Sequence, residues 1–302
     1  MKKIIVMCAA LIMGVSTVVA GNKLSLKDIT SGKFAPKGLG SITALDDGDT
    51  YAQVSKDGKK IVRYSFRTGK QTDVLFDVDN TVGEKISSFE DYIMSPDGSK
   101  LLIQTKSRKI YRRSFTAVYY IYNIGSRKLE KLSDYGPQQS PVWSPDGKQV
   151  AFVRDNNIHL VKLLYGNAES QVTKDGKKNE LINGIPDWVN EEEFGFSTAL
   201  TFNADGTMIC WIKYDEAAVQ QYSLEMFKGS NPEKKEYAEY PGAYTYKYPK
   251  AGQVNSKVAV YSYDIQSHQT RKLQVPLDAD GYIPRLYATK DAQKMIVYTF
   301  NR

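Results

Sequence analysis

The sequence predicts an all-β protein, and its tyrosine content and turn pattern are the observations that favour this fold class. Aromatic residues make up 12% of the 302 residues, with 21 tyrosines against 3 tryptophans. Tyrosine is enriched on half-buried pleated surfaces, which favours strands. Short apolar runs alternate with Asp-Gly turns, and a helical apolar period is absent except for a short turn near residues 188–194. A charged fraction of 25% and a hydrophobic fraction of 41% exclude a polytopic membrane protein and a disordered chain.

The first twenty residues predict a signal peptide. Two lysines follow the first methionine, residues 4–19 are almost wholly apolar or small, and a valine and an alanine suit a cleavage site before Gly21. The apolar run is short for a membrane-spanning helix, which needs about 20 residues. We therefore expect residues 1–20 to be removed from an exported protein, periplasmic or secreted. The mature part, residues 21–302, is then expected to have no membrane anchor.

One repeated unit is a tight polar turn followed by an apolar strand. The turns are residues 94–98 (MSPDG), 143–147 (WSPDG), 202–206 (FNADG) and, in a degenerate form, 288–292 (ATKDA). Asp-Gly supplies the positive φ angles that a short hairpin needs, and proline presets the entry to the turn. Each of these turns therefore predicts one β-hairpin.

A second repeated unit is a tyrosine-rich strand, a turn, and a strand that ends in leucine. It is found at residues 119–132 and 260–273 and, in a less regular form, at residues 61–75. One unit of each kind supplies four antiparallel strands. Four antiparallel strands are the content of one β-propeller blade.

The spacing of the turns also favours a β-propeller. The turn aspartates Asp57, Asp97, Asp146, Asp205 and Asp291 are separated by 40, 49, 59 and 86 residues, and known blades take about 40–50 residues. The first two intervals fit one blade each, and the third fits a blade with an insertion. The last fits either one blade with a long loop or nearly two blades. We expect about five four-stranded antiparallel blades, the last of them incomplete. A jelly roll or sandwich would not explain the recurring turn.

The sequence supplies no complete catalytic apparatus. His159 lies in an alternating strand and His268 between two strands, so neither is placed as a general base, and no Gly-x-Ser-x-Gly elbow is present. Phosphate loops, dinucleotide fingerprints and paired metal-ligand motifs are also missing from the sequence, so we expect no cofactor and no metal. The net charge of +7 is scattered, which predicts no nucleic-acid partner. Cys210, the only cysteine after signal cleavage, lies in an apolar run and is expected to be a buried core thiol.

The acidic segment at residues 183–194 (NGIPDWVNEEEF) is the strongest candidate for a functional site. It falls inside the stretched third interval, so we expect an insertion out of a blade. A run of charge is usually a solvated face. Here, however, Trp188, Val189 and Phe194 supply apolar anchors on both sides of the acids. We therefore expect the acids to be held at the base of a packed element.

Four stretches together resemble the dipeptidyl peptidase IV enzymes, which are serine exopeptidases of the prolyl oligopeptidase group. Residues 187–194 (DWVNEEEF) resemble the glutamate motif of that family, and residues 91–98 (DYIMSPDG) resemble the hairpin before its arginine strand. Residues 111–119 (YRRSFTAVY) resemble the arginine strand itself, and residues 248–255 (YPKAGQVN) a further signature. Order and spacing agree from Leu24 to the end. The resemblance implies an enzyme that releases N-terminal dipeptides of the Xaa-Pro or Xaa-Ala type.

In that family an N-terminal eight-bladed propeller caps a C-terminal α/β-hydrolase domain. The resemblance implies that residues 21–302 form part of this propeller, about five of its eight blades. The Ser-Asp-His triad and the hydrolase domain are not in this sequence, so we expect this chain alone to be inactive. The hydrolase domain would be the partner of this region, and the resemblance allows a homodimer in the parent enzyme.

The resemblance also assigns site residues. Glu192 and Glu193 match the two glutamates that hold the free amino terminus of the substrate peptide. Arg112 matches the arginine that contacts the carbonyl of the substrate's second residue, although the neighbouring Arg113 leaves a shift of one position open. Asn190 stands where a tyrosine is common, a change that is expected to be mild. Glu191, the first of the three acids, is expected to face solvent.

Two functions from different classes remain open at this point. The first is the substrate-anchoring part of an exported dipeptidyl peptidase IV-like enzyme. Its physical basis is that a free α-amine has a pKa near 8 and is mostly cationic at neutral pH, so that two carboxylates can bind it. The alternative is a self-standing, non-catalytic propeller that binds a peptide or protein partner.

Overall fold

A computed structural model describes residues 24–36, 38, 40–230 and 233–302 of the chain. The chain divides into two units after Ser41. In the described part of the first unit, helix α2 (Leu26–Thr30) is capped by Ser25, whose Oγ accepts the N–H of Asp28 at 3.1 Å. The predicted signal peptide lies outside the described residues. None of the helices that the structure describes is long and apolar enough to cross a membrane.

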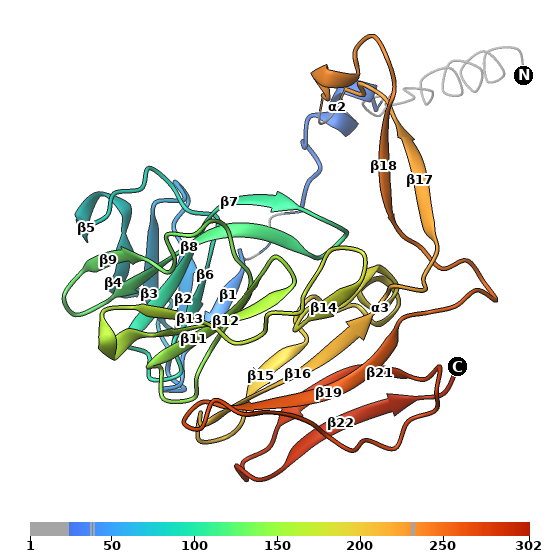
Figure 1. Cartoon of the computed structure of the whole chain (residues 1–302). Helices are drawn as coiled ribbons and strands as arrows, with labels where there is room; N and C mark the ends of the chain where they lie inside the picture. Colours follow the sequence, from blue (N-terminus) through green and yellow to red (C-terminus); the bar gives the residue numbers. More distant parts are fainter. Residues whose placement is uncertain (1–23, 37, 39, 231–232) are drawn as a thin grey trace, which may run out of the picture. The chain divides into compact units, whose positions relative to one another are not determined.

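The second unit, residues 42–302, contains four sheets and two further hairpins (Figure 1). The first sheet consists of β1 (Ile42–Ala44), β2 (Thr50–Val54), β3 (Lys60–Ser65) and β4 (Gln71–Asp77). The second consists of β5 (Val82–Gly83), β6 (Asp91–Met94), β7 (Lys100–Lys109), β8 (Phe115–Asn123) and β9 (Lys128–Lys131). The third consists of β10 (Gln139–Trp143), β11 (Gln149–Arg154), β12 (Asn157–Lys162) and β13 (Ala168–Gln171). The fourth consists of β14 (Leu181–Asn183), β15 (Leu200–Phe202), β16 (Met208–Asp215), β19 (Lys257–Asp264) and β20 (Thr270–Lys272).

The two hairpins and the helical turns complete the second unit. The hairpins are β17 (Gln221–Met226) with β18 (Gly242–Lys247), and β21 (Tyr282–Ala288) with β22 (Met295–Phe300). The helical elements are α3 (Trp188–Phe194) and the 3-10 helices η1 (Val78–Asn80), η2 (Leu163–Tyr165) and η3 (Lys235–Tyr237). Strand pairs between the described strands are antiparallel except for the short pair β5–β9.

The predicted turn units all form antiparallel hairpins, namely β6–β7, β10–β11, β15–β16 and β21–β22. In the first of these, Gly98 has a φ of 67° and donates its N–H to the Ser95 carbonyl at 2.8 Å. The Ser95 hydroxyl donates to Asp97 at 2.5 Å, and the equivalent bond to Asp146 is 2.6 Å long. The turn forms because the aspartate accepts local donors and the glycine adopts a left-handed conformation. The tyrosine-rich units are also antiparallel pairs, β3–β4, β8–β9 and β19–β20.

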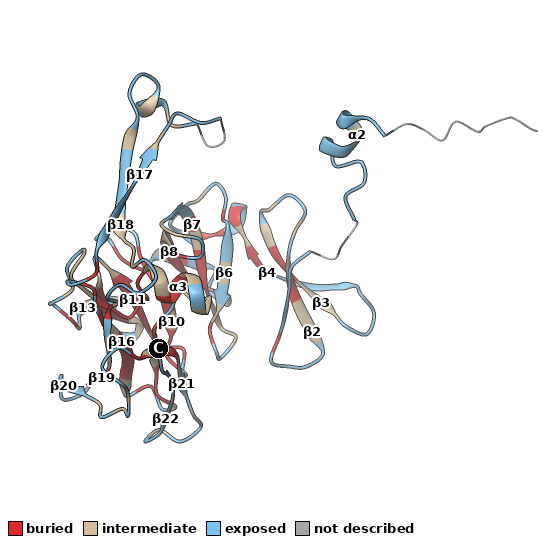
Figure 2. Cartoon of the chain, turned by 90° about the vertical axis from the view of Figure 1, so that its right-hand side faces the viewer, coloured by how far each residue is buried: buried red, intermediate tan, exposed pale blue. Residues whose placement is uncertain are grey.

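Sheets in the middle of the unit bury both of their faces. In β7, Leu101 and Ile103 belong to the same hydrophobic cluster as Phe76 of the first sheet. Leu102, which lies between them, belongs to the cluster of Phe152 in the third sheet. Because neighbouring strand residues point to opposite faces, the second sheet packs on the first with one face and on the third with the other. Figure 2 shows the buried residues running along these strands. This stacking is consistent with propeller blades, and it confirms the predicted all-β, antiparallel architecture.

An insertion divides the first strand of the fourth sheet. β14 pairs with the end of β16 and β15 pairs with its beginning, so the two strands together act as one interrupted strand. The two ends of the inserted segment meet where the Ala199 N–H donates to the Gly184 carbonyl at 2.8 Å. Gly184 has a φ of +80°, and a Cβ atom there would lie 2.9 Å from a Leu200 methyl carbon, so this crossing requires glycine. The inserted segment carries α3, as predicted for the acidic segment.

The β17–β18 hairpin explains the longest interval between turns. It follows β16 and precedes β19 in the sequence, and it extends away from the fourth sheet (Figure 1). The fourth sheet is completed only afterwards by β19 and β20, before the β21–β22 hairpin begins. Of the two alternatives for the 86-residue interval, the structure therefore supports one sheet with a long excursion.

Candidate functional site

Helix α3 is short, and both of its ends are fixed by specific contacts. Asp187 caps the N-terminus, because its Oδ1 accepts the N–H of Asn190 at 2.9 Å and the Asn190 side-chain amide at 2.8 Å. Its Oδ2 accepts a hydrogen bond from the Ser256 hydroxyl, next to β19. Burial raises the pKa of Asp187 above its ordinary value. The helix ends at Gly195, which is left-handed with a φ of 71° and donates to the Glu191 carbonyl at 3.0 Å.

Aromatic contacts and one arginine hold the helix against its neighbours. Trp188 packs on Tyr248 with ring centroids 4.2 Å apart, and Phe194 packs on Tyr282 at 5.5 Å. Arg285 of β21 donates to the Phe194 carbonyl at 2.8 Å, which places a cation at the C-terminal end of the helix. The expected apolar anchoring of the acidic run is confirmed for Trp188 and Phe194.

The three consecutive glutamates have three different environments. Glu191 is only 1% exposed, and its Oε1 accepts the backbone N–H groups of Arg113 at 2.7 Å and Ser114 at 2.9 Å. The expectation that Glu191 faces solvent is therefore wrong, because the loop between β7 and β8 lies on this side of the helix. Glu192 is partly exposed and pairs with Arg112 at 2.8 Å. Glu193 is exposed and lines a pocket.

The two neighbouring arginines have different contacts. The Arg112 guanidinium pairs with the Glu192 carboxylate, and its side chain is 71% exposed. Arg113 contributes its backbone N–H to Glu191, and its guanidinium lies beside Gly195, where a Cβ atom would be 3.2 Å from Nη2. The structure thus brings Arg112 together with the first of the two predicted glutamates.

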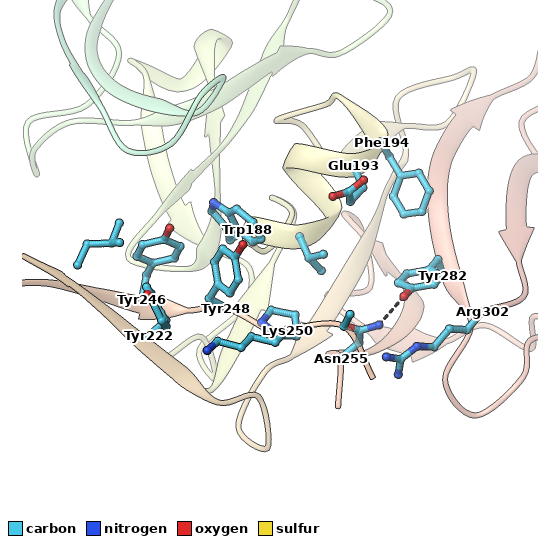
Figure 3. Close-up of a pocket in the computed structure, with 14 residues that line it drawn as sticks. Trp188, Glu193, Phe194, Tyr222, Tyr246, Tyr248, Lys250, Asn255, Tyr282 and Arg302 are labelled. Atoms are coloured by element: carbon cyan, nitrogen blue, oxygen red, sulfur yellow. Dashed lines mark hydrogen bonds between the residues drawn. The ribbon is translucent and has the colours of Figure 1, made fainter. Parts of the chain in front are cut away.

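The pocket beside Glu193 has a volume of about 970 Å³, and its wall combines aromatic side chains with the cationic side chains of Lys250 and Arg302 (Figure 3). Three of its tyrosines, Tyr222, Tyr246 and Tyr248, come from the β17–β18 hairpin and the segment that follows it, and Tyr282 comes from β21. Tyr248 lies 5.5 Å from Tyr222 and 5.9 Å from Tyr246 between ring centroids, and it also packs on Trp188. The Lys250 ammonium lies 5.1 Å from the Tyr222 ring centroid, so one tyrosine face already meets a cation of the chain. The exposed Glu193 carboxylate of the same pocket is the group that suits a bound ammonium.

Sequence reasoning did not assign this aromatic wall to the site. The signal for it was the alternation of tyrosines at 244, 246 and 248, which places them on one face of a strand. The packing of Tyr246 and Tyr248 on Trp188 of helix α3 depends on a hairpin that leaves the fourth sheet and returns to it, and the alternation alone does not reveal this.

A second cavity, of about 530 Å³, is lined by Tyr111, Tyr246 and the buried Glu216 among other residues. Burial, together with the Asp187 carboxylate, raises the pKa of Glu216 to about 7. Burial also raises the pKa of Tyr111. Tyr111 therefore stays protonated at neutral pH and can donate a hydrogen bond.

The histidines and Cys210 have structural environments. His159 lies in β12, stacked on Phe152 with ring centroids 5.4 Å apart, and contacts Arg154 and Glu169 at 3.1 Å each. His268 lies in the turn between β19 and β20, as predicted. Cys210 is buried in β16, as predicted, and burial raises its pKa to about 11. In the described ranges, no three or more His, Cys, Asp or Glu side chains form a group that could hold a metal ion.

Comparison with known proteins gives the family. The sequence matches the family described as "Dipeptidyl peptidase IV (DPP IV) N-terminal region" over residues 95–302, more than two thirds of the chain. The chain belongs to the dipeptidyl peptidase IV family. It is 32% identical to the probable dipeptidyl-aminopeptidase B of Emericella nidulans, over 94% of this chain and 33% of that protein. It is 30% identical to the human prolyl endopeptidase FAP, over 80% of this chain and 30% of that protein.

A solved member of the dipeptidyl peptidase IV family shares the fold of this chain. The crystal structure of Porphyromonas gingivalis dipeptidyl peptidase 4 superposes with a TM-score of 0.85 at 38% identity, over 92% of this chain and 38% of that one. The resemblance predicted from the sequence motifs is therefore confirmed, and the chain corresponds to an N-terminal region of the dipeptidyl peptidase IV type. It spans about a third of the length of the relatives that it matches.

Proposed function

We propose that this chain is the substrate-anchoring propeller region of an exported dipeptidyl peptidase IV-like serine exopeptidase that releases N-terminal dipeptides of the Xaa-Pro or Xaa-Ala type. The observation that carries the proposal is the placement of two carboxylates on one short helix. Glu192 is paired with Arg112, and Glu193 opens to an aromatic pocket. In this proposal both carboxylates bind the free amino terminus of the peptide, and Arg112 contacts the carbonyl of its second residue.

The chemistry of a peptide terminus fits these groups. An ammonium 4 Å from a carboxylate gains about 4 kcal/mol at an effective dielectric of 20. When its ammonium is fixed, the substrate peptide extends a set distance toward the nucleophile. The peptide bond after its second residue is then the one that is cleaved. An internal segment brings no ammonium and would cover the carboxylates without pairing them, which disfavours its binding.

The proposed enzyme also needs a nucleophile, which we assign to a C-terminal α/β-hydrolase domain with a Ser-Asp-His triad. Membership of the dipeptidyl peptidase IV family supports this partner. In the same proposal, the four sheets and the β21–β22 hairpin are about five of eight propeller blades. Export to the periplasm or beyond is supported by the apolar run at residues 4–19. Phe227 and Tyr240, which are 63% and 79% exposed between β17 and β18, offer an apolar surface for a homodimer.

Peptide binding to the chain tests the anchoring role directly. The chain is titrated by NMR with an Ala-Pro-Ala tripeptide that has a free amino terminus, and then with the N-acetylated form. We expect the acetylated peptide to bind at least about tenfold more weakly, because it lacks the ammonium. Equal affinity for the two peptides would contradict the proposal. It would favour the alternative of a self-standing propeller that binds a peptide or protein partner through other groups.

A further inference from the structure

We infer that Glu191 is a positioning residue, whose buried carboxylate ties the loop that carries Arg112 to helix α3. This tie sets the place of the Arg112 guanidinium relative to Glu192 and Glu193. The inference rests on the proposed function for its consequence in peptide binding. The tie itself can be measured without any peptide.

The contact joins two parts of the chain that are distant in sequence. One oxygen of Glu191 accepts N–H groups from two consecutive residues, Arg113 and Ser114, which are 78 and 77 residues away. Both bonds are shorter than 3 Å, and the accepting carboxylate is 1% exposed. Burial of the acceptor protects these hydrogen bonds from competition with water.

The loop is closed on itself, so that fixing two of its amides also fixes Arg112. The Ile110 N–H donates to the Ser114 carbonyl at 2.9 Å, and the Tyr111 N–H donates to the Ser114 hydroxyl at 3.3 Å. Arg112 is thus one member of a tight turn whose last two N–H groups end on Glu191. The guanidinium can move only by rotation of its own side chain.

The ion pair between Arg112 and Glu192 cannot supply this order alone. The Arg112 side chain is 71% exposed, and an exposed ion pair loses much of its attraction to solvent screening and to the entropy of a long side chain. By contrast, the Glu191 contacts act on the backbone, and their acceptor is buried. The position of the Arg112 guanidinium is therefore set by Glu191. Glu192 only pairs with a guanidinium that is already in place.

The opposite side of the loop is supported by the hairpin. The Tyr111 ring lies 5.8 Å from the ring of Tyr246, and the Tyr244 hydroxyl donates to the Ile110 carbonyl at 3.4 Å. The loop is therefore held between the helix and β18. Because the hairpin contacts do not reach the amides of Arg113 and Ser114, removal of the Glu191 carboxylate should release those two amides selectively.

The first experiment needs no peptide. Amide hydrogen exchange of Arg113 and Ser114 is followed by NMR in the full chain and in Glu191→Ala, Glu191→Gln and the control Glu169→Gln. Glu169 is a largely enclosed acid of β13, with a side chain 10% exposed, that pairs with Arg154, so its replacement also changes a carboxylate that has protein partners. We expect exchange at both amides to be at least about tenfold faster in Glu191→Ala, with partial recovery in Glu191→Gln, whose Oε1 still accepts, and no change in Glu169→Gln.

Two results would overturn the inference. One is that both amides of the unaltered chain already exchange at the rate of exposed amides. The other is that exchange at both amides is the same in Glu191→Ala as in the unaltered chain, or that Glu169→Gln accelerates it as much as Glu191→Ala does. The first result can be read without any variant, so it decides the case even if Glu191→Ala does not fold.

The second experiment measures the consequence for binding. Affinity for the free Ala-Pro-Ala tripeptide is compared in the unaltered chain, Arg112→Ala, Glu191→Gln and the double variant. If Glu191 acts through Arg112, adding Glu191→Gln to Arg112→Ala costs nothing further, whereas each single change costs about tenfold. Additive losses would show that Glu191 acts independently and would contradict the inference. If the unaltered chain does not discriminate free from acetylated peptide, the proposed function fails, and the exchange experiment still decides whether Glu191 fixes the loop.

Discussion

Replacing Glu193 by glutamine is the sharpest test of the proposed peptide site. The side chain keeps its shape and loses its charge. Among the contacts of the described residues, Glu193 forms no ion pair, so the change breaks none that the structure shows; Glu192→Gln, in contrast, would also release Arg112. The effect of Glu193→Gln on a bound ammonium is therefore easier to interpret.

The size of the effect follows from the contact that is lost. One charge-assisted hydrogen bond contributes about 1.5–3 kcal/mol, which corresponds to roughly 10- to 150-fold in affinity. Acetylation of the peptide removes the ammonium from the other side of the same contact. The two losses should therefore not add, and acetylation should cost less in Glu193→Gln than in the unaltered chain.

The assay measures four affinities by calorimetry, those of the unaltered chain and of Glu193→Gln, each for the free and for the acetylated peptide. In a full-length enzyme that contains this region, kcat/KM for the free peptide should fall by the same factor. The matched control is Glu130→Gln, a partly exposed acid of β9 that pairs with Lys128, and its affinities for the free and the acetylated peptide should equal those of the unaltered chain. Fully additive losses, or an equal effect of the control, would refute the assignment of Glu193 to the amino terminus.

Three further outcomes are expected. Gly184→Ala should lower the free energy of unfolding by about 1–3 kcal/mol more than Gly58→Ala in urea denaturation, because both glycines have positive φ but only Gly184 is crowded; equal losses would contradict this. Glu216 has a pKa of about 7 in the folded chain against an ordinary value of 4.5, so its contribution to stability is present below pH 4.5 and is lost as the pH rises through 7. Glu216→Gln should therefore flatten the dependence of the unfolding free energy on pH between these values. An unchanged dependence would count against the pKa shift. The purified chain should hydrolyse no dipeptidyl chromogenic substrate, and turnover that survives serine-reactive inhibitor controls would disprove this.

The parts of the fold that the sequence predicted are those governed by local chemistry. A turn such as the one around Asp97 and Gly98 is specified by a side chain that accepts nearby donors and by a glycine that tolerates positive φ. The hairpins could therefore be placed to within a few residues. The insertion at α3 was also predicted, because it stretched an otherwise regular interval.

The parts that the sequence could not supply depend on contacts between distant segments. Nothing near Glu191 in the sequence indicates that the amides of Arg113 and Ser114 will meet its carboxylate, since they lie on another sheet. The same holds for Tyr246, which reaches both Tyr111 and Trp188 from the inserted hairpin. Such contacts follow from the stacking of the sheets, which composition and turn spacing do not determine.

The acidic run shows why adjacent identical residues need not share a role. Successive side chains of an α-helix point about 100° apart, so three consecutive acids on a helix held on several sides face three different surroundings. One side of α3 is covered by the loop between β7 and β8, which buries Glu191. Glu192 points in the next direction and meets the exposed Arg112. Glu193 points in the third direction and lines the pocket with the tyrosines. A uniform solvated face would need a helix with free sides, and the packing of Trp188 and Phe194 excludes that arrangement here. Substitutions in this run should therefore be interpreted by the direction of each side chain and not by its charge alone.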